Sequence, residues 1–414
     1  CRWVCAAWVV ADVVLLSFLT LSLRQGSRCF AMPPIPRLSR GEAISVTAMA
    51  LLASTLLIIA LLSPPNTADA MTYHLARITH WVQHKSLAFY PTNNSRQLMM
   101  SPCAEQMILH FHLLTGGDRF DNVLQWLSMI GSVVGVVLIA EQMGVPRGGR
   151  ILAAIFCITI PMGILQATST QNDYVASLWL VAFVYYALRF LKSGSRVDAA
   201  AVGASLGLAV LTKITAVIFA FPFAIGVAVS VIRKGRPTWI ATACIIPLVI
   251  LCLNAPHWGR NVALYGSPVG TVSLRAFRPT NETYGLRGLA SNVIRNLALH
   301  AETPVEPLNH WTRNRVLAAH RLLGADPNDR RTTWHDSQFD IGGLSCSEDT
   351  QGNGIHLLAI IATCLILAIP RRRTDSRGTL PALLALALCA GGILFAVLLK
   401  WQPWHSRLQL PLLF

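Results

Sequence analysis

The sequence predicts an all-α polytopic integral membrane protein, on the basis of its composition, its long uncharged segments and the position of its basic residues. The 414 residues are 53% hydrophobic and only 13% charged, whereas a soluble domain carries about 25% charged residues. Uncharged segments of about 20 residues, long enough to cross a bilayer as a helix, recur along most of the chain. This composition excludes an ordinary soluble domain.

We expect at least ten transmembrane helices, one for each apolar segment. Because the chain starts at Cys1 and stops within a further apolar run, LQLPLLF, we interpret it as a fragment and this number as a minimum. Gly203 and Gly207, like Gly131 and Gly135, have the four-residue spacing of closely packed helices. The predicted spans are 3–23, 43–63, 123–142, 151–167, 173–190, 198–212, 214–232, 238–254, 354–370 and 379–400.

The position of the basic residues predicts the orientation of the chain. The net charge of +15 is compatible with nucleic-acid binding, but the basic residues collect in short links between apolar segments, where they orient transmembrane helices. We therefore predict no nucleic-acid partner, with these links in the cytoplasm and the two long loops on the other side. The basic residues of the links are Arg24, Arg28, Arg37, Arg40, Arg147, Arg150, Arg189, Lys192, Arg196, Arg233, Lys234, Arg236, Arg371, Arg372, Arg373 and Arg377.

The predicted organisation has three membrane-spanning parts separated by two external loops. The first loop contains two apolar stripes with the period of an amphipathic helix, and such helices lie flat in the membrane interface. The second loop is either a small external subdomain or a lid. The stripes are Met71, Leu75, Ile78 and Val82, then Ala104, Ile108 and Phe111. The parts are 1–63 with two transmembrane helices, the first loop 64–122, further transmembrane helices in 123–254, the second loop 255–353, and truncated C-terminal helices in 354–414.

Six charged residues are predicted to gather at the external membrane surface. Ionisable groups held at membrane depth are costly and indicate function, although single charges at helix ends also serve as simple interfacial anchors. The convergence of both signs on one face favours a site. The six residues are Asp69, Glu105, Asp173, Lys213, Arg260 and Arg407.

Carboxylates beside Arg and Lys at this surface suit a transfer reaction on a lipid-linked phosphate. Arg binds phosphate oxygens through two parallel hydrogen bonds, and a carboxylate can take the proton from an attacking hydroxyl. Phosphate leaves readily when nearby cations stabilise its charge. The charge pattern therefore indicates group transfer from a phosphate-linked lipid.

Several segments resemble one family of membrane glycosyltransferases. DAMTYHLARITHWVQHKSLAFYPT and SPCAEQMILHFHLLTGGDRFDNVLQW resemble the first external loop of the GT-C class, in its bacterial dolichyl-phosphate-mannose-protein mannosyltransferase-like branch (glycosyltransferase family 39). The resemblance continues through TQNDYVA, RNVALYGSP, SEDTQGNGIH and HSRLQLP, and so spans nearly the whole chain. It implies a GT-C fold and a sugar donor linked to polyprenyl phosphate.

The resemblance also implies roles for particular residues. Asp69 takes the position of the catalytic base, Asp173 that of a second acid near the start of a later helix, and Glu105 that of a further acid in the loop. Arg260 and Arg407, with Lys213, correspond to contacts with the carrier phosphate. We assign substrate binding to His74, Arg77, Asn261 and Trp404. Many relatives have DE where this chain has DA, so the neighbouring carboxylate is absent at Ala70.

No metal-ligand motif accompanies these residues. The first-loop histidines lack the HExxH spacing or a comparable ligand set. We therefore predict no metal site and assign no cofactor, since no ligand motif supports a divalent metal. These histidines are His74, His80, His84, His110 and His112.

The predicted function is an inverting glycosyltransferase that moves a sugar from a polyprenyl-phosphate donor to a hydroxyl of a glycan, lipid or protein acceptor. We expect it in a bacterial inner membrane, in contact with membrane lipids, with its active site facing the periplasm. One alternative is a transporter or flippase for lipid-linked sugars, although such proteins tend to show internal repeats. Another is an O-antigen-ligase-like enzyme, in which His257 or His335 would be important and Asp69 would not.

Overall fold

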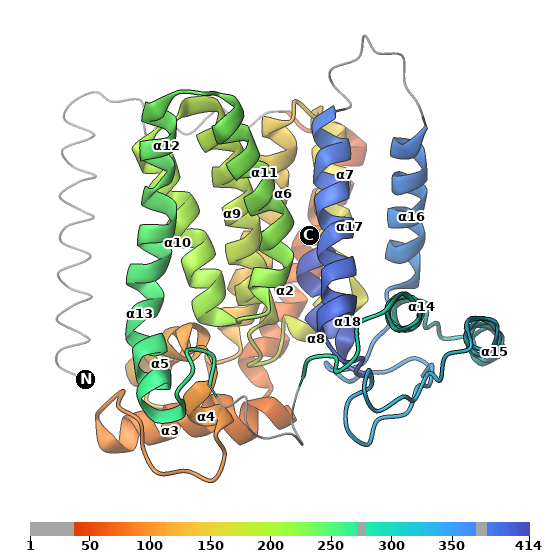
Figure 1. Cartoon of the computed structure of the whole chain (residues 1–414), viewed down its shortest axis with the longest axis horizontal. Coiled ribbons are helices and arrows are strands. Elements are labelled where there is room, and N and C mark those ends of the chain that lie inside the picture. The colour runs from red at the N-terminus through yellow and green to blue at the C-terminus, as the bar shows by residue number, and fades with distance from the viewer. Residues whose placement is uncertain (1–36, 271–278, 370–378) are drawn as a thin grey trace.

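The computed structural model describes residues 37–270, 279–369 and 379–414, and it shows a bundle of long helices with shorter helices across one end (Figure 1). The described residues contain two isolated β-bridges, Thr280–Leu399 and Thr333–Trp401, and no strand. The all-α prediction is confirmed. The span predicted at 3–23, with Arg24 and Arg28, lies outside the described residues, as do the basic residues predicted at 371–377.

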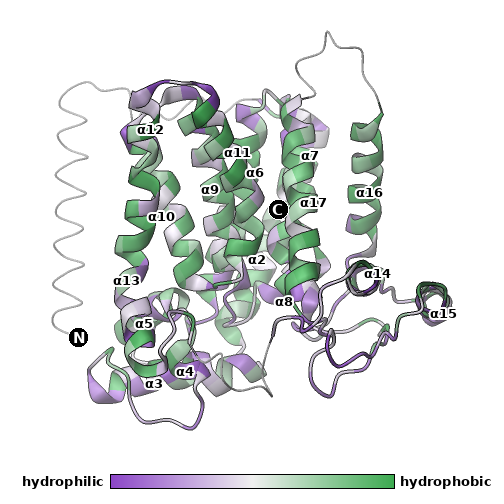
Figure 2. Cartoon of the chain, in the orientation of Figure 1, coloured by the Kyte–Doolittle hydropathy of each residue, from purple (hydrophilic) through white to green (hydrophobic). Residues whose placement is uncertain are grey.

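Six helices in the described residues are long and apolar enough to cross a membrane. They are α2 (Arg40–Leu62), α6 (Val123–Gln142), α9 (Asp173–Ser193), α11 (Ala216–Arg233), the continuous pair α12 (Pro237–Ala243) and α13 (Ile245–Tyr265), and α17 (Thr379–Leu398). Three shorter helices stand beside them, namely α7 (Arg147–Ile158), α10 (Arg196–Thr212) and α16 (Gly354–Ala368). Hydrophobic residues predominate along the bundle helices (Figure 2), as a lipid environment requires.

The span predicted at 151–167 is not one helix. The chain leaves the helical conformation at Ile160, and Pro161 begins the separate short helix α8 (Pro161–Gln166). Proline has no N–H for a helical hydrogen bond, and it disfavours the helical conformation in the residue before it. The expected number of at least ten spans is therefore not confirmed, although most predicted spans correspond to helices.

The two ends of the bundle differ in character. The links between α6 and α7, α9 and α10, and α11 and α12 lie at one end, and the helices of both long loops lie at the other (Figure 1). The loop helices are the π-turn η2 (Ala70–His74), α3 (Leu75–His84), α4 (Arg96–Met99), α5 (Cys103–Thr115), α14 (Leu286–His300) and α15 (Glu306–Leu323). The last elements, α18 (His405–Leu408) and the 3₁₀ turn η5 (Leu410–Leu412), return into the bundle.

The predicted amphipathic helices of the first loop are present as α3 and α5, and they pack against each other. Ile78 and Trp81 of α3 join Ala104 and Ile108 of α5 in one buried apolar cluster. Met71 is different, because it lies in η2 and is mostly exposed. The stripe residues therefore hold the loop helices against the bundle, which gives the first loop a defined position.

The glycine pairs allow close helix contacts, as predicted. A Cβ atom added at Gly203 would lie 2.8 Å from the carbonyl oxygen of Ile246, and one at Gly207 would lie 2.8 Å from a methyl carbon of Leu253. Gly131 and Gly135 lie equally close to side chains of α9. Close packing of α10 on α13 depends on the absence of a side chain at Gly203, since its nearest neighbour is backbone.

Replacing Gly203 should therefore destabilise the bundle. We expect Gly203→Ala to lower the free energy of unfolding by about 1–3 kcal/mol, because helix α13 must move away. Gly226→Ala in α11 is the matched control, since nothing lies within 4 Å of its Cβ position and alanine favours a helix. Thermal unfolding in detergent measures both. Equal melting temperatures for the two variants would contradict the packing account.

Candidate active site

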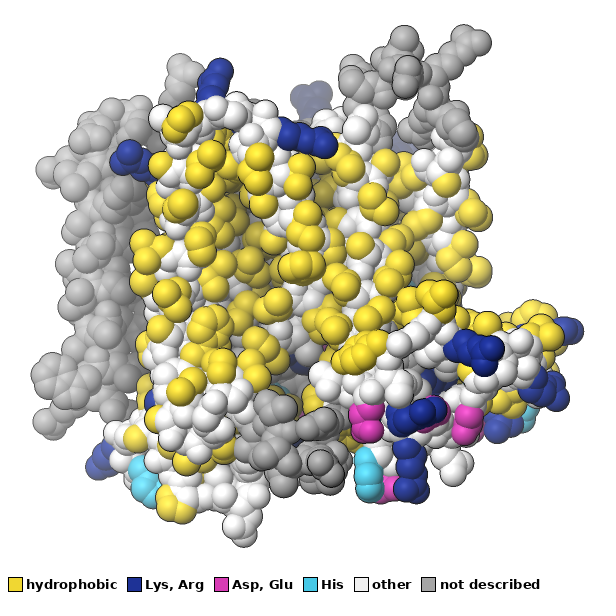
Figure 3. Space-filling view, viewed as in Figure 1, with side chains coloured by type: hydrophobic (Ala, Val, Ile, Leu, Met, Phe, Trp, Pro, Cys, Tyr) yellow, Lys and Arg dark blue, Asp and Glu magenta, His cyan; other side chains and the backbone are white. Residues whose placement is uncertain are grey.

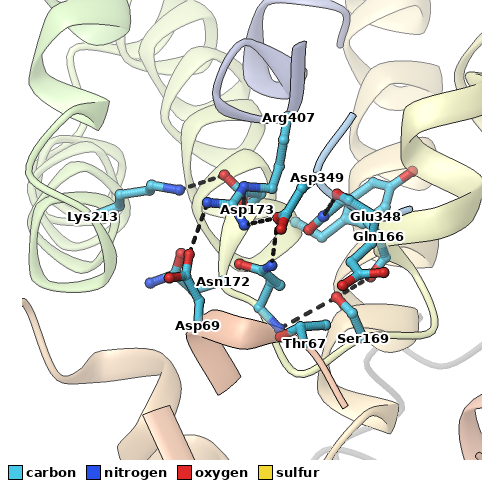
Figure 4. Close-up of polar contacts among 12 residues, drawn as sticks. Thr67, Asp69, Gln166, Ser169, Asn172, Asp173, Lys213, Glu348, Asp349 and Arg407 are labelled. Carbon is cyan, nitrogen blue, oxygen red and sulfur yellow. Dashed lines mark hydrogen bonds and ion pairs between the residues drawn. The ribbon is translucent and has the colours of Figure 1, made fainter. Parts of the chain in front are cut away.

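The side chain of Arg407 forms the centre of a charged cluster at the loop-bearing end of the bundle (Figure 4). Its Nη2 atom lies 2.9 Å from Oδ2 of Asp69, and its Nε atom lies 3.6 Å from Oδ2 of Asp173. Its Nη1 atom donates a hydrogen bond to Asp349. The other Asp173 oxygen lies 2.5 Å from the ammonium group of Lys213. Four of the six predicted charged residues therefore meet in one cluster, together with Asp349.

The cluster residues come from segments far apart in the sequence. Asp69 follows the end of α2, where the Thr67 hydroxyl accepts a hydrogen bond from the N–H of Ala70. Asp173 is the first residue of α9, and Lys213 caps the end of α10. A carboxylate at a helix start and a cation at a helix end both agree with the helix dipole. Asp173 and Lys213 are thus positioned directly by the ends of α9 and α10.

Exposure separates the carboxylates that a substrate can reach from the one that it cannot. The side chain of Asp173 is 1% exposed, whereas those of Asp69 and Asp349 are 20% and 33% exposed. Arg407 itself is buried. A general base must come within hydrogen-bond distance of its substrate, so Asp69 and Asp349 are the available carboxylates and Asp173 is suited to holding the cations.

A π-turn shapes the chain directly after Asp69. In η2 the carbonyl oxygen of Thr72 accepts hydrogen bonds from the side chains of Asn94 (3.1 Å) and Gln97 (2.8 Å). These bonds bring Arg96 to 3.4 Å from Oδ1 of Asp69, where its guanidinium also lies over the Tyr73 ring. Single π-turns occur frequently at functional sites, and this one gives Asp69 a second cationic neighbour.

The cations determine the charge state of Asp69. Burial raises the pKa of its carboxyl group, but the positive charge of Arg407 and its hydrogen bond outweigh this effect, so the pKa is lowered. For Arg407 burial opposes the charged form, and the charges of Asp173, Asp69 and Asp349 more than compensate, so its pKa is raised. Asp69 is therefore ionised at neutral pH, as a proton acceptor must be.

His74, Arg77 and Glu105 form a second buried group within the first loop. Nδ1 of His74 lies 2.7 Å from Oε1 of Glu105, and Nη1 of Arg77 lies 3.4 Å from the same oxygen. Arg77 also donates hydrogen bonds to the carbonyl oxygens of Arg96, Gln97 and Met100. The three side chains are buried and hold residues 96–100 in place, the segment that carries Arg96 to Asp69. The catalytic role of Glu105 remains a prediction.

Arg260, Asn261 and Trp404 lie outside the Arg407 cluster. Arg260 donates a hydrogen bond to the carbonyl oxygen of Leu87 (2.7 Å) and lies over the Phe89 ring. Asn261 is buried and donates to the carbonyl oxygens of residues 99 and 268. Trp404 makes an edge-to-face contact with the indole ring of Trp334. In the structure each of the three side chains contacts another part of the chain. Their contacts with substrate remain a prediction.

Asp349 is the cluster residue that the sequence reasoning missed. Its segment is fixed by Gln166, which donates to the Glu348 carbonyl oxygen, and by Gln171, whose amide lies 3.2 Å from Asp349 Oδ1. The only sequence signal was its place in SEDTQGNGIH, one of the segments that carried the family resemblance. An aspartate within a polar loop has no periodicity that would indicate its partner.

The first-loop histidines have local partners. His80 and His84 stack with the Tyr90 ring, and Nδ1 of His112 lies 3.2 Å from Asp121. Within residues 37–270, 279–369 and 379–414, no group of three or more His, Cys, Asp or Glu side chains is arranged to hold a metal ion.

Comparison with known proteins identifies the fold. The family described as dolichyl-phosphate-mannose-protein mannosyltransferase matches residues 100–259, so the resemblance predicted from sequence is confirmed over that range. The fold is similar to the crystal structure of ArnT from Cupriavidus metallidurans bound to undecaprenyl phosphate, with a TM-score of 0.56 and 12% sequence identity. The similarity covers 89% of this chain and 58% of that one. No curated protein sequence matches the chain. The GT-C fold is thus confirmed.

The buried Arg77–Glu105 pair permits a direct test of its structural role. Arg77→Met leaves the Glu105 charge without its cation, which should cost about 3–5 kcal/mol of unfolding free energy. Adding Glu105→Gln removes that charge and should recover part of the loss, while the lost bonds to residues 96–100 persist. Thermal unfolding of the two single variants and the double variant measures this coupling. Additive effects would show that the two side chains act independently.

Proposed function

We propose that this chain is an inverting glycosyltransferase that moves a sugar from a polyprenyl-phosphate donor to an acceptor hydroxyl. The confirmed GT-C fold and the family match support glycosyl transfer as the reaction class. The cluster of Asp69, Asp173, Asp349, Lys213 and Arg407 is the observation that carries the proposal. It joins an accessible carboxylate to two cations at one end of a membrane bundle.

The reaction begins when Asp69 takes the proton from the acceptor hydroxyl. The hydroxyl oxygen attacks the anomeric carbon, the bond between that carbon and the phosphate oxygen breaks, and polyprenyl phosphate leaves from the opposite face of the sugar. A single displacement of this kind inverts the anomeric configuration. Arg407 and Lys213 stabilise the negative charge that develops on the departing phosphate.

Arg407 needs an unoccupied bonding position before it can bind the donor phosphate. All three nitrogens of its guanidinium face carboxylates. Asp349 is the most exposed of these and lies in a loop, so we assign it as the carboxylate that the phosphate replaces. The phosphate replaces a carboxylate of equal charge, so Arg407 stays beside Asp69 and keeps it ionised as a base.

Asp173 holds Lys213 and Arg407 in position, which agrees with its deep burial. We assign the phosphate to these two cations, and Arg260 remains a candidate contact from the family resemblance. His257 and His335 do not enter this mechanism. His257 is buried beside Asn261, and His335 pairs with its neighbour Asp336 on the surface. Neither contacts the cluster in the described part of the chain, which gives the O-antigen-ligase-like alternative little support.

The cluster is proposed to face the periplasm of a bacterial inner membrane. The short basic links lie at the opposite end of the bundle (Figure 3), and such links remain in the cytoplasm. Lipid-linked donors and membrane-associated acceptors are both accessible at this surface.

Asp69→Asn should abolish sugar transfer while the protein remains folded. Loss of a general base lowers the rate by about 10²–10⁴-fold, and the amide keeps the shape of the side chain. The assay supplies membranes with labelled polyprenyl-phosphate sugars, and screening several sugars also reports donor preference. Asp118→Asn, an exposed carboxylate of the same loop, is the control and should transfer at the wild-type rate. Transfer by a folded Asp69→Asn variant at the wild-type rate would exclude the proposed base.

The transfer rate should also depend on pH through Asp69. Because its pKa is lowered in the folded chain, the carboxylate stays ionised in mild acid, and the rate falls only as the pH drops through this lowered value. Arg407→Gln removes the strongest influence that lowers the pKa and leaves burial, which raises it. The acidic limb of the residual rate should therefore move to higher pH. An unchanged limb would assign the titration to another group.

A further inference from the structure

Helix α14 buries all its polar side chains between residues 291 and 300 and exposes two of its leucines, while Ala298 and Leu299 are buried. Asn292 and Arg295 are fully buried and bind neighbouring segments, Arg295 through the Thr333 hydroxyl and Asn292 through the Ala396 carbonyl oxygen. On the outer side Leu286 is 85% exposed, and Leu297 is also exposed. A helix at a water surface has the opposite arrangement. The outer face of α14 is therefore built for a non-aqueous environment.

Helix α15 continues this apolar surface. Leu308, Trp311 and Leu322 lie on one face by helical spacing, since they are separated by three and eleven residues. All three are exposed, and the side chain of Leu322 is 91% exposed. Asn314 and His310 occupy the exposed polar flank of the same helix. We call α14 and α15 together (286–323) the α14–α15 arm, an amphipathic surface with its apolar face unpartnered in the described chain.

The arm lies where the transmembrane surface ends. The N–H of Asn353, directly before α16, donates to the carbonyl oxygen of His300 at the end of α14 (2.9 Å). The first turns of α16 expose Ile355 and Leu358, which belong to the lipid-facing surface. Figure 3 shows hydrophobic side chains on the arm where it adjoins the transmembrane helices, with basic side chains beside them. The apolar face of the arm is thus continuous with the surface that contacts lipid.

The charge of the arm indicates which lipids it contacts. Four exposed arginines on the arm and in the turn after it, unlike Arg313 and Arg331, have no acidic partner among the described residues. Arg315 stands within the apolar face, and its guanidinium lies 5.3 Å from the centre of the Trp311 ring. A long cationic side chain on an apolar face can place its charge among lipid headgroups. The four arginines are Arg287, Arg315, Arg321 and Arg330.

We propose that the α14–α15 arm is a membrane-docking surface that lies in the headgroup region on the side of the candidate active site and prefers anionic phospholipids. The apolar face enters the boundary between headgroups and acyl chains, as an interfacial helix does. The unpaired arginines bind lipid phosphates, each giving about a fivefold preference for an anionic surface. A lipid occupant explains why most polar side chains of α14 face the protein interior, whereas a second protein chain bound at this surface would not require that arrangement.

Photocrosslinking in lipid nanodiscs tests the docking surface with the full chain. p-Benzoylphenylalanine replaces Leu322 on the apolar face or, as the matched control, Asn314 on the polar flank. The nanodiscs contain equal parts of phosphatidylglycerol and phosphatidylcholine. We expect lipid adducts of the Leu322 probe by mass spectrometry, and few from the Asn314 probe. Both positions are exposed, so unfolding does not complicate the comparison. Crosslinks of the Leu322 probe to another protein chain, or no crosslinks, would overturn the proposal.

The lipid preference is tested on the same Leu322 probe. Phosphatidylglycerol adducts should exceed phosphatidylcholine adducts at least about fivefold, and Arg315→Gln with Arg321→Gln should return this ratio toward one. Arg313→Gln is the control and should keep the ratio, because Arg313 is paired with Asp340. A ratio that the double variant leaves unchanged would overturn the assignment of these arginines to lipid phosphate.

Discussion

The buried guanidinium of Arg407 is the interaction on which the rest of the site depends. It joins Asp69 after α2, Asp173 at the start of α9 and Asp349 before α16, so three distant segments meet at one side chain. A buried charge is stable only when it is paired and hydrogen-bonded. This requirement ties together the helix ends that form the cluster, and it makes Arg407 a structural element as well as a phosphate ligand.

The same pairing suits the proposed chemistry because a donor phosphate can take the place of one carboxylate at Arg407. A polyprenyl-phosphate sugar carries one negative charge on its phosphodiester, the same charge as one carboxylate. If it replaces Asp349 at Arg407, the total charge around the guanidinium does not change. The buried Asp173 stays with Lys213, and the partly exposed Asp69 remains beside the acceptor. Differences in exposure among three similar carboxylates thus separate three roles.

Much of the fold could be predicted because apolar length directly reflects membrane thickness. The span predicted at 123–142 coincides with α6, and the start predicted at residue 173 coincides with that of α9. The same reasoning failed at Ile160, where one proline divides an apolar segment into two helices. It could not identify the orientation of α14, which buries most of its polar residues, because the order of polar and apolar residues does not show which face of a helix meets water.

The site was predicted in part, for a related reason. Asp69, Asp173 and Lys213 lie next to long apolar helices, so topology placed them at one surface. Arg260 lies at the same surface yet contacts Leu87 and Phe89, because topology determines the depth of a residue and not its lateral position. Asp349 lies in a polar segment whose path is determined by side-chain hydrogen bonds to Gln166 and Gln171. Such contacts have no signature in a single sequence.

The most direct test is whether the phosphate of the polyprenyl carrier binds at Arg407. The ³¹P resonance of polyprenyl phosphate in nanodiscs reports this without requiring the sugar or the acceptor to be known. Wild-type protein should shift the resonance, Arg407→Lys should shift it less because lysine lacks the two-pronged geometry of arginine, and Arg407→Gln should leave it unshifted. A folded Arg407→Gln variant that shifts the resonance as the wild type does would contradict the assignment of Arg407 as the phosphate ligand.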